Sequence, residues 1–359
     1  SCGEAGLQGP RRVHPKGVDA MSGRGRVRPG RMKPTVVARR RFLKRSLAAT
    51  VTAPVMMSLE EQRLLARAES PGGAVPPVAP AGRMKTGRIG KVEMSRLICG
   101  GNLISGYAHS RDLIYVSKLL KHYFTDDRIM ETWALCEQHG INTMVAGGDP
   151  HAVEVYRKYR ARGGKMQYLA QITPTKTDLS TAVLEAVDAG ACGAFLVGNL
   201  GDLWTREGAL GRIGEVVTKI KASGLIAGVA GHELRTIQAV EKAGIAPDFY
   251  VKTLHGTDYW SRQRPEQTKE IIDNYAEDNY WCRDPRETIR FMAELERPWI
   301  AYKVLAAGAI PPRVGFRHAF ENGADFALVG MFDFQVAENV SVAGQILSEP
   351  LDRERAWMA

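Results

Sequence analysis

The chain has 359 residues, 44% of them hydrophobic, which suffices for one large domain with a leader or for two ordinary domains. Its net charge is +10, but residues 1–85 hold 17 Lys and Arg against 5 Asp and Glu, whereas residues 86–359 hold 32 against 34. Because nucleic-acid binding needs clustered cations on the folded part, this distribution excludes that function. The five cysteines show no spacing typical of metal ligands.

Residues 1–80 are predicted to form a basic, disordered leader that carries an export signal. Residues 38–44 read Ala-Arg-Arg-Arg-Phe-Leu-Lys and resemble a twin-arginine signal, in which two arginines precede any residue and then Phe-Leu-Lys. The apolar run that follows, residues 46–57, is shorter than the roughly 20 residues of a transmembrane helix. We therefore expect export by the twin-arginine machinery to the periplasm or the medium. The alternative is a basic tail without a targeting role.

From residue 87 onward one pattern repeats about every 30 to 40 residues: a short apolar run, a glycine or polar turn, and a helical segment. Apolar runs of this kind indicate strands that are covered on both faces, as in a parallel sheet. Eight strand and helix pairs predict an α/β protein, a (β/α)8 barrel over residues 87–347 with a C-terminal tail at 348–359. The predicted strands are residues 96–99, 142–146, 168–172, 193–197, 225–230, 248–254, 299–305 and 326–329.

Capping residues indicate where the helices begin. Asp126 and Asp127 are expected to cap a helix at residues 128–138, Asp178 one at 181–189, and Pro285 opens the helix after the sixth strand. After the fourth strand we expect a single helix that ends at Ala222. Long aromatic loops are predicted after the first strand and between residues 255 and 282.

Several segments resemble the aldo/keto reductase family. Residues 90–102 (GKVEMSRLICGGN) are similar to its opening, residues 300–308 (IAYKVLAAG) to its seventh strand, and Leu328-Val329-Gly330 with Glu338-Asn339 to its eighth strand and following helix. The resemblance implies the (β/α)8 fold. It also implies a nicotinamide dinucleotide site on the loops after strands seven and eight, with Tyr302, Gly308 and Gly330 as cofactor-binding residues.

The positions that carry that family's chemistry differ in this chain. Val145 stands where the resemblance places the catalytic Asp, Gln171 where it places the Lys, and Gly198-Asn199 where it places the His. The Ser-Asn pair that holds the nicotinamide amide reads Ala230-Gly231. We therefore do not expect hydride transfer by that mechanism, and NAD(P) is the less favoured cofactor.

Histidines that follow predicted strands suggest a metal site at the barrel mouth. His232 and His255 follow neighbouring strands, so their rings can converge, and Glu233 supplies a third ligand. Imidazole and carboxylate ligands suit a divalent ion that acts as a Lewis acid on a hydroxyl or carbonyl. Glu233 and Asp149 are the candidate catalytic carboxylates. The alternative is that each histidine only hydrogen-bonds its loop.

Two lysines form a second candidate constellation, Lys252 on the sixth strand and Lys303 on the seventh. Their surroundings resemble strands six and seven of deoxyribose-phosphate-type class I aldolases. Two ammonium groups that face each other lower one another's pKa, which frees an amine for Schiff-base formation. Alternatively, the lysines bind an anionic substrate or pair with Glu233 and Asp333.

Aromatic and polar residues after the strands are typical of a sugar-binding cleft, in which flat rings contact C–H groups and polar groups contact hydroxyls. The alternative is a loop that packs on itself. The candidate substrate residues are His151, Asn199, Asp202, Trp204, Tyr259 and Trp260.

The sequence thus predicts an exported (β/α)8 enzyme that acts on a sugar-derived or carbonyl-containing small molecule, with a divalent metal and lyase, isomerase or hydrolase chemistry. Three alternatives stay open. They are an NAD(P)-binding oxidoreductase, a Schiff-base aldolase that uses Lys252 or Lys303, and a carbohydrate-binding barrel without catalysis.

Overall fold

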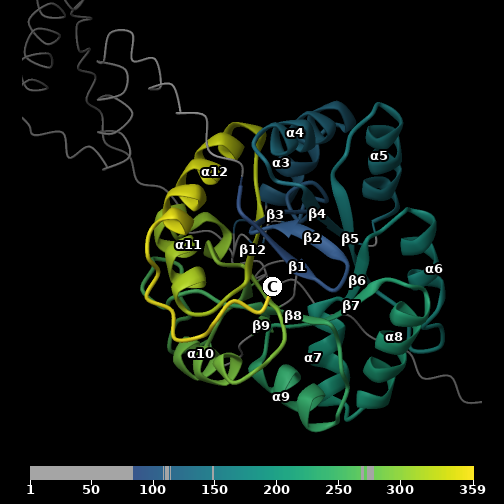
Figure 1. Ribbon diagram of the computed structural model, residues 1–359, viewed down its shortest axis with the longest axis vertical. Helices are drawn as coiled ribbons and strands as arrows, with labels where there is room; N and C mark the ends of the chain where they lie inside the picture. Colours follow the sequence, from purple (N-terminus) through teal and green to yellow (C-terminus); the bar gives the residue numbers. More distant parts are fainter. Residues whose placement is uncertain are drawn as a thin grey trace, which may run out of the picture. The chain divides into compact units, whose positions relative to one another are not determined.

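The computed structural model describes residues 84–359, except 108, 110–112, 114, 148, 268–270 and 273–278, so the predicted export signal lies outside the described residues. Eight parallel strands close into a barrel in the order β11-β12-β3-β4-β5-β6-β7-β8 (Figure 1). This confirms the predicted (β/α)8 fold. The barrel strands are β3 (Leu97–Gly100), β4 (Thr143–Gly147), β5 (Gln167–Ile172), β6 (Gly193–Leu196), β7 (Ile226–Gly231), β8 (Phe249–Thr253), β11 (Trp299–Tyr302) and β12 (Phe326–Gly330).

The barrel strands are buried on both faces, as their apolar sequences predict. Every residue of β3, β6, β7, β8 and β11 is buried. Alternate residues fill the barrel interior, where Val145, Leu169 and Phe195 belong to one apolar cluster with Phe249 and Ile300. The residues between them pack against the surrounding helices in a second, larger cluster. This alternation decides which side chains can reach the barrel axis.

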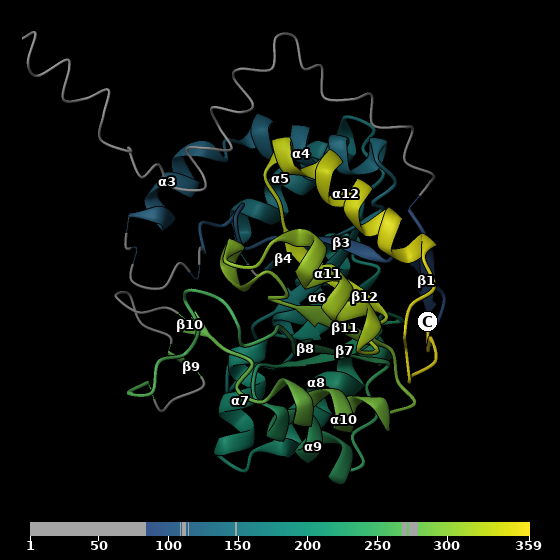
Figure 2. The ribbon, with the colours of Figure 1, turned by 90° about the vertical axis from the view of Figure 1, so that its left-hand side faces the viewer.

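Helices surround the barrel (Figures 1 and 2). Thr125, not Asp126, caps α4 by accepting from the Arg128 N–H, and Pro285 opens α10 as predicted. No helix in the described part of the chain is long and apolar enough to cross a membrane. The helices that follow barrel strands are α4 (Asp126–Gln138), α5 (Pro150–Ala161), α6 (Thr181–Asp188), α7 (Gly198–Arg206), α8 (Leu210–Ala222), α9 (Leu234–Lys242), α10 (Pro285–Ala293), α11 (Pro312–Glu321) and α12 (Asp333–Ser348).

An antiparallel hairpin that the sequence analysis missed precedes the barrel. Strands β1 (Thr86–Ile89) and β2 (Val92–Ser95) are joined at Gly90, whose φ of 54° favours glycine. Ile89, Val92 and Met94 join the apolar cluster of the barrel interior. The hairpin therefore closes the N-terminal end of the barrel.

Three loop predictions need correction. The helix expected after the fourth barrel strand is two helices, α7 and α8, separated by a turn with Gly208 at φ 69°. The first long loop contains α3 (Val116–Tyr123), and the second contains the short strands β9 (Ile271–Ile272) and β10 (Asn279–Tyr280). Strand β11 ends at Tyr302 because Lys303 takes a φ of 59°, after which the 3-10 helix η1 (Ala306–Gly308) forms.

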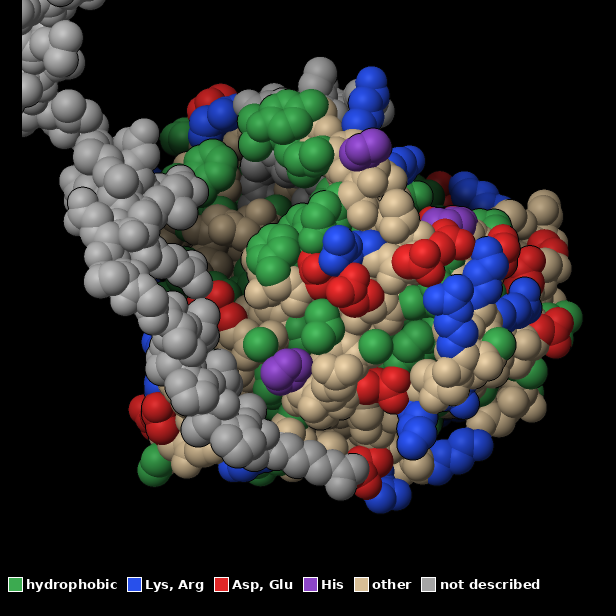
Figure 3. Space-filling view, turned by 90° about the horizontal axis from the view of Figure 1, so that it is seen from above, with side chains coloured by type: hydrophobic (Ala, Val, Ile, Leu, Met, Phe, Trp, Pro, Cys, Tyr) green, Lys and Arg blue, Asp and Glu red, His purple; other side chains and the backbone are tan. Residues whose placement is uncertain are grey.

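Charged side chains of both signs cover the helix layer. Lys158 pairs with Asp126 and Glu154 at 2.9 and 2.8 Å, and Arg128 pairs with Glu131 at 2.9 Å. Acidic and basic side chains are intermixed on the face in Figure 3. Exposed pairs of this kind contribute little to stability, typically about 0 to 1 kcal/mol each.

Candidate functional site

Polar and aromatic side chains converge at the mouth of the barrel, where the strands end. His232 follows the last residue of β7, Asp202 lies in α7, and Tyr302 ends β11. His232 lies two residues after Ala230, which points into the barrel, so its side chain points the same way. It is only 3% exposed. Lys303 comes directly after Tyr302 and is half-buried. Residues from three different strand ends therefore form one site, the usual position of function in this fold.

Asp202 fixes the imidazole of His232. Its carboxylate accepts a hydrogen bond from His232 Nδ1 at 2.8 Å and from the His232 N–H at 3.0 Å. It also accepts from the Glu233 N–H at 3.2 Å and from the Thr236 hydroxyl at 2.7 Å. Because a carboxylate can only accept, Nδ1 carries the proton. The lone pair is then on Nε2, for which the described residues supply no hydrogen-bond donor.

The charges of this pair are set by burial and by each other. Burial lowers the pKa of His232 to about 4, although Asp202 opposes this, and the charge of Lys303 lowers it further. Burial would raise the pKa of Asp202, but the hydrogen bonds from His232 and Thr236 outweigh it, and that pKa is lowered. At neutral pH the site thus holds a carboxylate and a neutral imidazole.

Aromatic rings surround the imidazole. Tyr280 stacks on His232 with ring centroids 4.1 Å apart, and Tyr302 stacks at 5.2 Å. The Lys303 ammonium lies 4.4 Å from the Tyr280 ring centroid and 5.3 Å from that of Tyr302, within the range of cation–π attraction. A side chain at Gly198 would bring its Cβ to 2.5 Å from the Tyr302 hydroxyl and 2.6 Å from His232 Cε1. Glycine at this position therefore lets α7 begin against the rings.

Two hydroxyls at the barrel mouth, those of Tyr302 and Thr253, lack partners other than each other. Tyr302 and Thr253 are neighbours in the β11 and β8 register, and apart from each other neither hydroxyl has a hydrogen-bond partner among the described residues. Burial and the charge of Asp202 raise the pKa of Tyr302 well above its usual value, so its O–H stays a donor. A buried hydroxyl without a partner costs about 1 to 3 kcal/mol, which a polar ligand would recover.

The structure does not support the predicted metal site, because its side chains have other partners. The ring of His255 lies between two main-chain groups: Nδ1 contacts the Gly256 carbonyl at 2.9 Å, and Nε2 accepts from the Cys282 N–H at 2.9 Å. Glu233 pairs with Arg206 at 2.8 Å and with Arg235. Within the described ranges, no three His, Cys, Asp or Glu side chains form a group that could hold a metal ion.

Asp149 and His151 belong to the helix layer and not to the mouth. Asp149 caps α5 by accepting from the His151 N–H at 3.0 Å. His151 Nε2 lies 2.8 Å from Asp126 Oδ1 on α4, with half of its side chain exposed. The structure therefore does not support their predicted catalytic and substrate roles, since Asp149 caps α5 and His151 joins α5 to α4.

The two candidate lysines do not face each other. Val251 points into the barrel, so Lys252 beside it points toward the helices, where it is fully buried. Its ammonium donates to the carbonyls of His232 at 2.6 Å and Thr253 at 3.0 Å. The Schiff-base prediction thus loses its geometric premise. Lys252 instead holds the backbone that presents His232.

The predicted sugar-binding residues divide by exposure. Trp204 is fully buried in the core, and Tyr259 packs with Trp281 in a small apolar cluster, so neither offers a face to a ligand. Trp260 is 76% exposed, and Asn199 is exposed in the first turn of α7. Three further exposed aromatics lie on loops or helix starts after barrel strands: Tyr107, Tyr115 and Phe334.

The residues present do not fit a nicotinamide dinucleotide at the loops after β11 and β12. The Tyr302 ring is covered by His232 and Lys303. The N–H groups of Ala306, Gly308 and Ile310 donate to carbonyls within the same turn, at 2.9 to 3.1 Å. Gly330 leads into α12, whose first turn carries the carboxylate of Asp333, paired with Arg128 at 2.8 Å. A carboxylate at this helix N-terminus opposes binding of a phosphate.

We therefore expect NADPH to cause neither fluorescence quenching nor a shift in Tm, measured by titration and thermal unfolding. A ligand present at 100 times its Kd would stabilise the protein by about 2.7 kcal/mol. An aldo/keto reductase treated in parallel serves as the positive control. A saturable shift with NADPH would contradict this prediction and restore the reductase hypothesis.

No protein-family model matches the chain, and no curated protein matches it. Among solved structures, a candidate aldo-keto reductase from Pseudomonas aeruginosa is 17% identical, with a TM-score of 0.52 over 75% of this chain and 99% of that one. A second structure of a candidate aldo-keto reductase from the same organism is 18% identical, with a TM-score of 0.49 over 73% and 96%. The holo aldo-keto reductase of Bacillus halodurans is 12% identical, with a TM-score of 0.47 over 74% and 96%.

The first of these likenesses defines the class of the fold, a (β/α)8 barrel similar to that of aldo-keto reductases. Fold alone does not determine chemistry. The side chains at the barrel mouth carry the functional argument.

Proposed function

We propose that this protein is an enzyme that transfers a proton on a small molecule with carbonyl and hydroxyl groups, in the class of sugar derivatives. One observation carries the proposal: a buried, neutral imidazole whose Nδ1 is fixed by Asp202 at 2.8 Å. An imidazole with its lone pair on Nε2 can accept a proton there, and with a pKa of about 4 it is a weak base at neutral pH. Its position after a barrel strand is where this fold places catalytic groups.

The neighbouring groups supply the remaining roles. His232 Nε2 takes a proton from the carbon next to the carbonyl, and Asp202 stabilises the imidazolium that forms. The Lys303 ammonium and the Tyr302 hydroxyl, both beside the imidazole, stabilise the negative charge that develops on the carbonyl oxygen. Return of the proton to a neighbouring atom gives an isomerase, and loss of a β-substituent gives a lyase. If His232 activates water instead, the outcome is hydrolysis.

The exposed aromatics support a polyhydroxylated substrate. Trp260, Tyr107 and Phe334 are exposed by 76, 59 and 69% and follow three different barrel strands. Flat apolar faces beside polar groups suit the C–H and O–H faces of a sugar. The same faces would serve a carbohydrate-binding barrel without catalysis. The test must therefore detect proton transfer and not only binding of a sugar.

The test is exchange of substrate protons with solvent deuterium. The native protein, purified without chelator, is incubated in D2O with a panel of aldoses, ketoses and sugar acids, and NMR follows the C–H signals next to each carbonyl. Exchange should occur with at least one compound and fall about 100-fold or more in His232→Ala. His151→Ala, an exposed histidine on α5, is the matched control and should leave the rate unchanged.

Two results would overturn the proposal. Exchange that survives in His232→Ala would remove the proposed base. Saturable binding of a sugar without exchange or turnover would indicate the carbohydrate-binding barrel. Loss of exchange on addition of EDTA would bring back a metal that acts with the substrate at this mouth.

Export by the twin-arginine route is also a proposal, since residues 39–44 lie outside the described residues. Replacing Arg39 and Arg40 with Lys should leave most of the protein in the cytoplasm with its leader attached, because Lys lacks the planar guanidinium fork. Fractionation and immunoblotting measure this. Arg24→Lys with Arg26→Lys is the matched control and should export normally. Normal export of the Arg39 and Arg40 variant would contradict the signal.

A further inference from the structure

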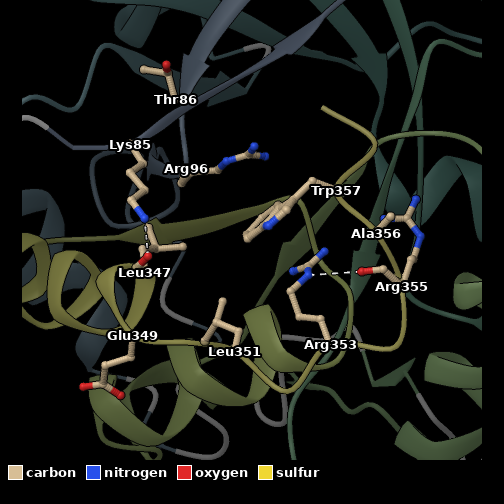
Figure 4. Close-up of a pocket in the computed structure, with 10 residues that line it drawn as sticks. All are labelled: Lys85, Thr86, Arg96, Leu347, Glu349, Leu351, Arg353, Arg355, Ala356 and Trp357. Carbon is tan, nitrogen blue, oxygen red and sulfur yellow. Dashed lines mark hydrogen bonds between the residues drawn. The ribbon is translucent and has the colours of Figure 1, made fainter.

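A cavity of about 460 Å³ lies at the end of the barrel opposite the His232 site (Figure 4). Arg96 precedes β3, and Asp325 beneath the cavity precedes β12, which places it at the N-terminal ends of the strands. The other walls come from β1, the end of α12 and the C-terminal tail. This volume is within the range of small-molecule sites.

Cations dominate the lining of this cavity. Lys85, Arg96, Arg353 and Arg355 line it together with one carboxylate, that of Glu349. Glu349 pairs with Arg317, and in Figure 4 its carboxylate is directed away from the arginines. The structure thus gathers more positive than negative charge around one cavity that is open to solvent.

Two of the four cations contact a carboxylate. Arg355 pairs with Asp325 at 2.9 Å. Arg96 donates to a carboxylate oxygen of Ala359, the last residue of the chain. Lys85 and Arg353 form no ion pair in the described part of the chain, and they donate to main-chain oxygens. Lys85 donates to Leu347, Arg96 to Asp325 and Ala359 at 3.0 and 2.6 Å, and Arg353 to Phe320, Gly323, Ala324 and Arg355.

The guanidinium of Arg96 is held in a fixed position. It lies 4.1 Å from the Trp357 ring centroid, and Arg353 lies 3.6 Å from the same ring. On its other side, a Cβ at Gly87 would come within 2.5 Å of Arg96 Nη1. Glycine therefore lets the guanidinium lie flat against β1. A donor held by packing loses little entropy when it binds a ligand.

The pKa values of two of these arginines are lowered. Burial lowers the pKa of Arg96, although Asp325 opposes this. Burial also lowers the pKa of Arg353 to about 10. The charge of Asp325 opposes this shift, and the charges of Arg355 and Arg96 add to it. An anion in the cavity would offset both effects.

We propose that this cavity binds a small phosphate monoester. Lys85, Arg96 and Arg353 hold the dianionic group, and the apolar part lies against Leu347, Leu351 and the exposed edge of Trp357. Lys85 and Arg353 lack a carboxylate partner, so together with Arg96 they match a dianion better than a monocarboxylate, and arginine geometry suits phosphate oxygens. The site is separate from the barrel mouth, so its occupation regulates or stabilises the protein without taking part in proton transfer.

Calorimetric titration of the full chain with phenyl phosphate and with benzoate, at constant ionic strength, tests the proposal. Phenyl phosphate should bind with one site per chain and at least tenfold tighter than benzoate. Arg96→Gln and Arg353→Gln should each weaken it at least tenfold. Gly87→Ala should weaken it through displacement of Arg96. Arg157→Gln on α5 changes the net charge equally and is the matched control, expected to bind as the native protein does.

Circular dichroism confirms that each variant is folded, and Arg353→Lys, which keeps the charge, should retain part of the affinity. Equal binding of benzoate and phenyl phosphate would overturn the dianion assignment. Binding that does not saturate would show only general ion attraction and overturn the site. The same conclusion would follow if Arg96→Gln and Arg353→Gln bound phenyl phosphate as tightly as Arg157→Gln does. Saturable binding that also persists unchanged in Gly87→Ala would contradict the role of Arg96.

Discussion

Replacing Arg355 with Ala should lower the free energy of unfolding by about 3 to 5 kcal/mol, the usual result of breaking a buried ion pair. The Arg355 guanidinium is 4% exposed and the Asp325 carboxylate is fully buried, 2.9 Å away. Arg355 also donates to the carbonyls of Gly323 at 2.9 Å, Leu295 at 3.1 Å and Arg297 at 2.7 Å. Removing it leaves a buried carboxylate without its cation and three carbonyls without this donor.

The effect is large because the residue joins three parts of the chain. Leu295 and Arg297 lie between α10 and β11, Gly323 and Asp325 between α11 and β12, and Arg355 comes from the tail. Chemical denaturation measures the change directly. In a domain of this size about 1 kcal/mol corresponds to 2 to 4 °C, so Tm should fall by roughly 10 °C.

Arg317→Ala is the matched control. Arg317 also forms two ion pairs, with Glu321 at 2.9 Å and with Glu349, but these lie at the surface of α11. Water solvates the partners that remain, so the Tm should change little. If Arg355→Ala changed Tm no more than Arg317→Ala does, the tail would not be part of the cooperative structure.

The fold could be predicted because its signals are local. Each barrel strand is a short apolar run beside a glycine or polar turn, and the predicted strand at 193–197 differs from β6 by one residue. The hairpin of β1 and β2 was missed because it lies outside the repeated strand and helix pairs from which the barrel was predicted. The Gly90-Lys91 pair between Ile89 and Val92 was the available signal.

The site was predicted less well because its contacts are distant in the sequence. His255 is satisfied by the Cys282 N–H, 27 residues away, which no local pattern shows. Asp202 accepts from His232, 30 residues away, yet a signal existed: a carboxylate between Leu203 and Gly201 on the apolar face of α7 needs a buried partner. The outward direction of Lys252 also follows from simple alternation with Val251.

Replacing Asp202 with Asn should lower kcat/KM about 10²- to 10⁴-fold for the substrate that the exchange screen identifies. The Asn side chain is nearly isosteric but presents an N–H₂ group as well as an oxygen. The oxygen is required at the Oδ1 position by the N–H groups of His232 and Glu233 and by the Thr236 hydroxyl. The N–H₂ group then faces His232 Nδ1, which must accept, and the proton moves to Nε2. An imidazole with that tautomer cannot act as the base.

Nitrogen NMR of labelled histidine distinguishes the tautomers, and steady-state kinetics give the rate. Asp258→Asn is the matched control, because Asp258 follows β8 near the mouth but its side chain is fully exposed to solvent. Its kcat/KM should match that of the native protein. An Asp202→Asn variant with kcat/KM within about threefold of native, or an unchanged His232 tautomer, would contradict the assigned role.

The pH dependence separates loss of the tautomer from protonation of the base. The base must be neutral, and burial lowers the pKa of His232 from 6.5 to about 4, so native kcat/KM should be constant at neutral pH and fall as the pH drops through about 4. The neutral folded state also contributes stability that is complete above pH 6.5 and lost as the pH falls toward 4. Asp202 raises the His232 pKa, so its replacement lowers that pKa further and keeps the ring neutral at pH 7. A rate loss at pH 7 in Asp202→Asn therefore reports the position of the proton on the imidazole.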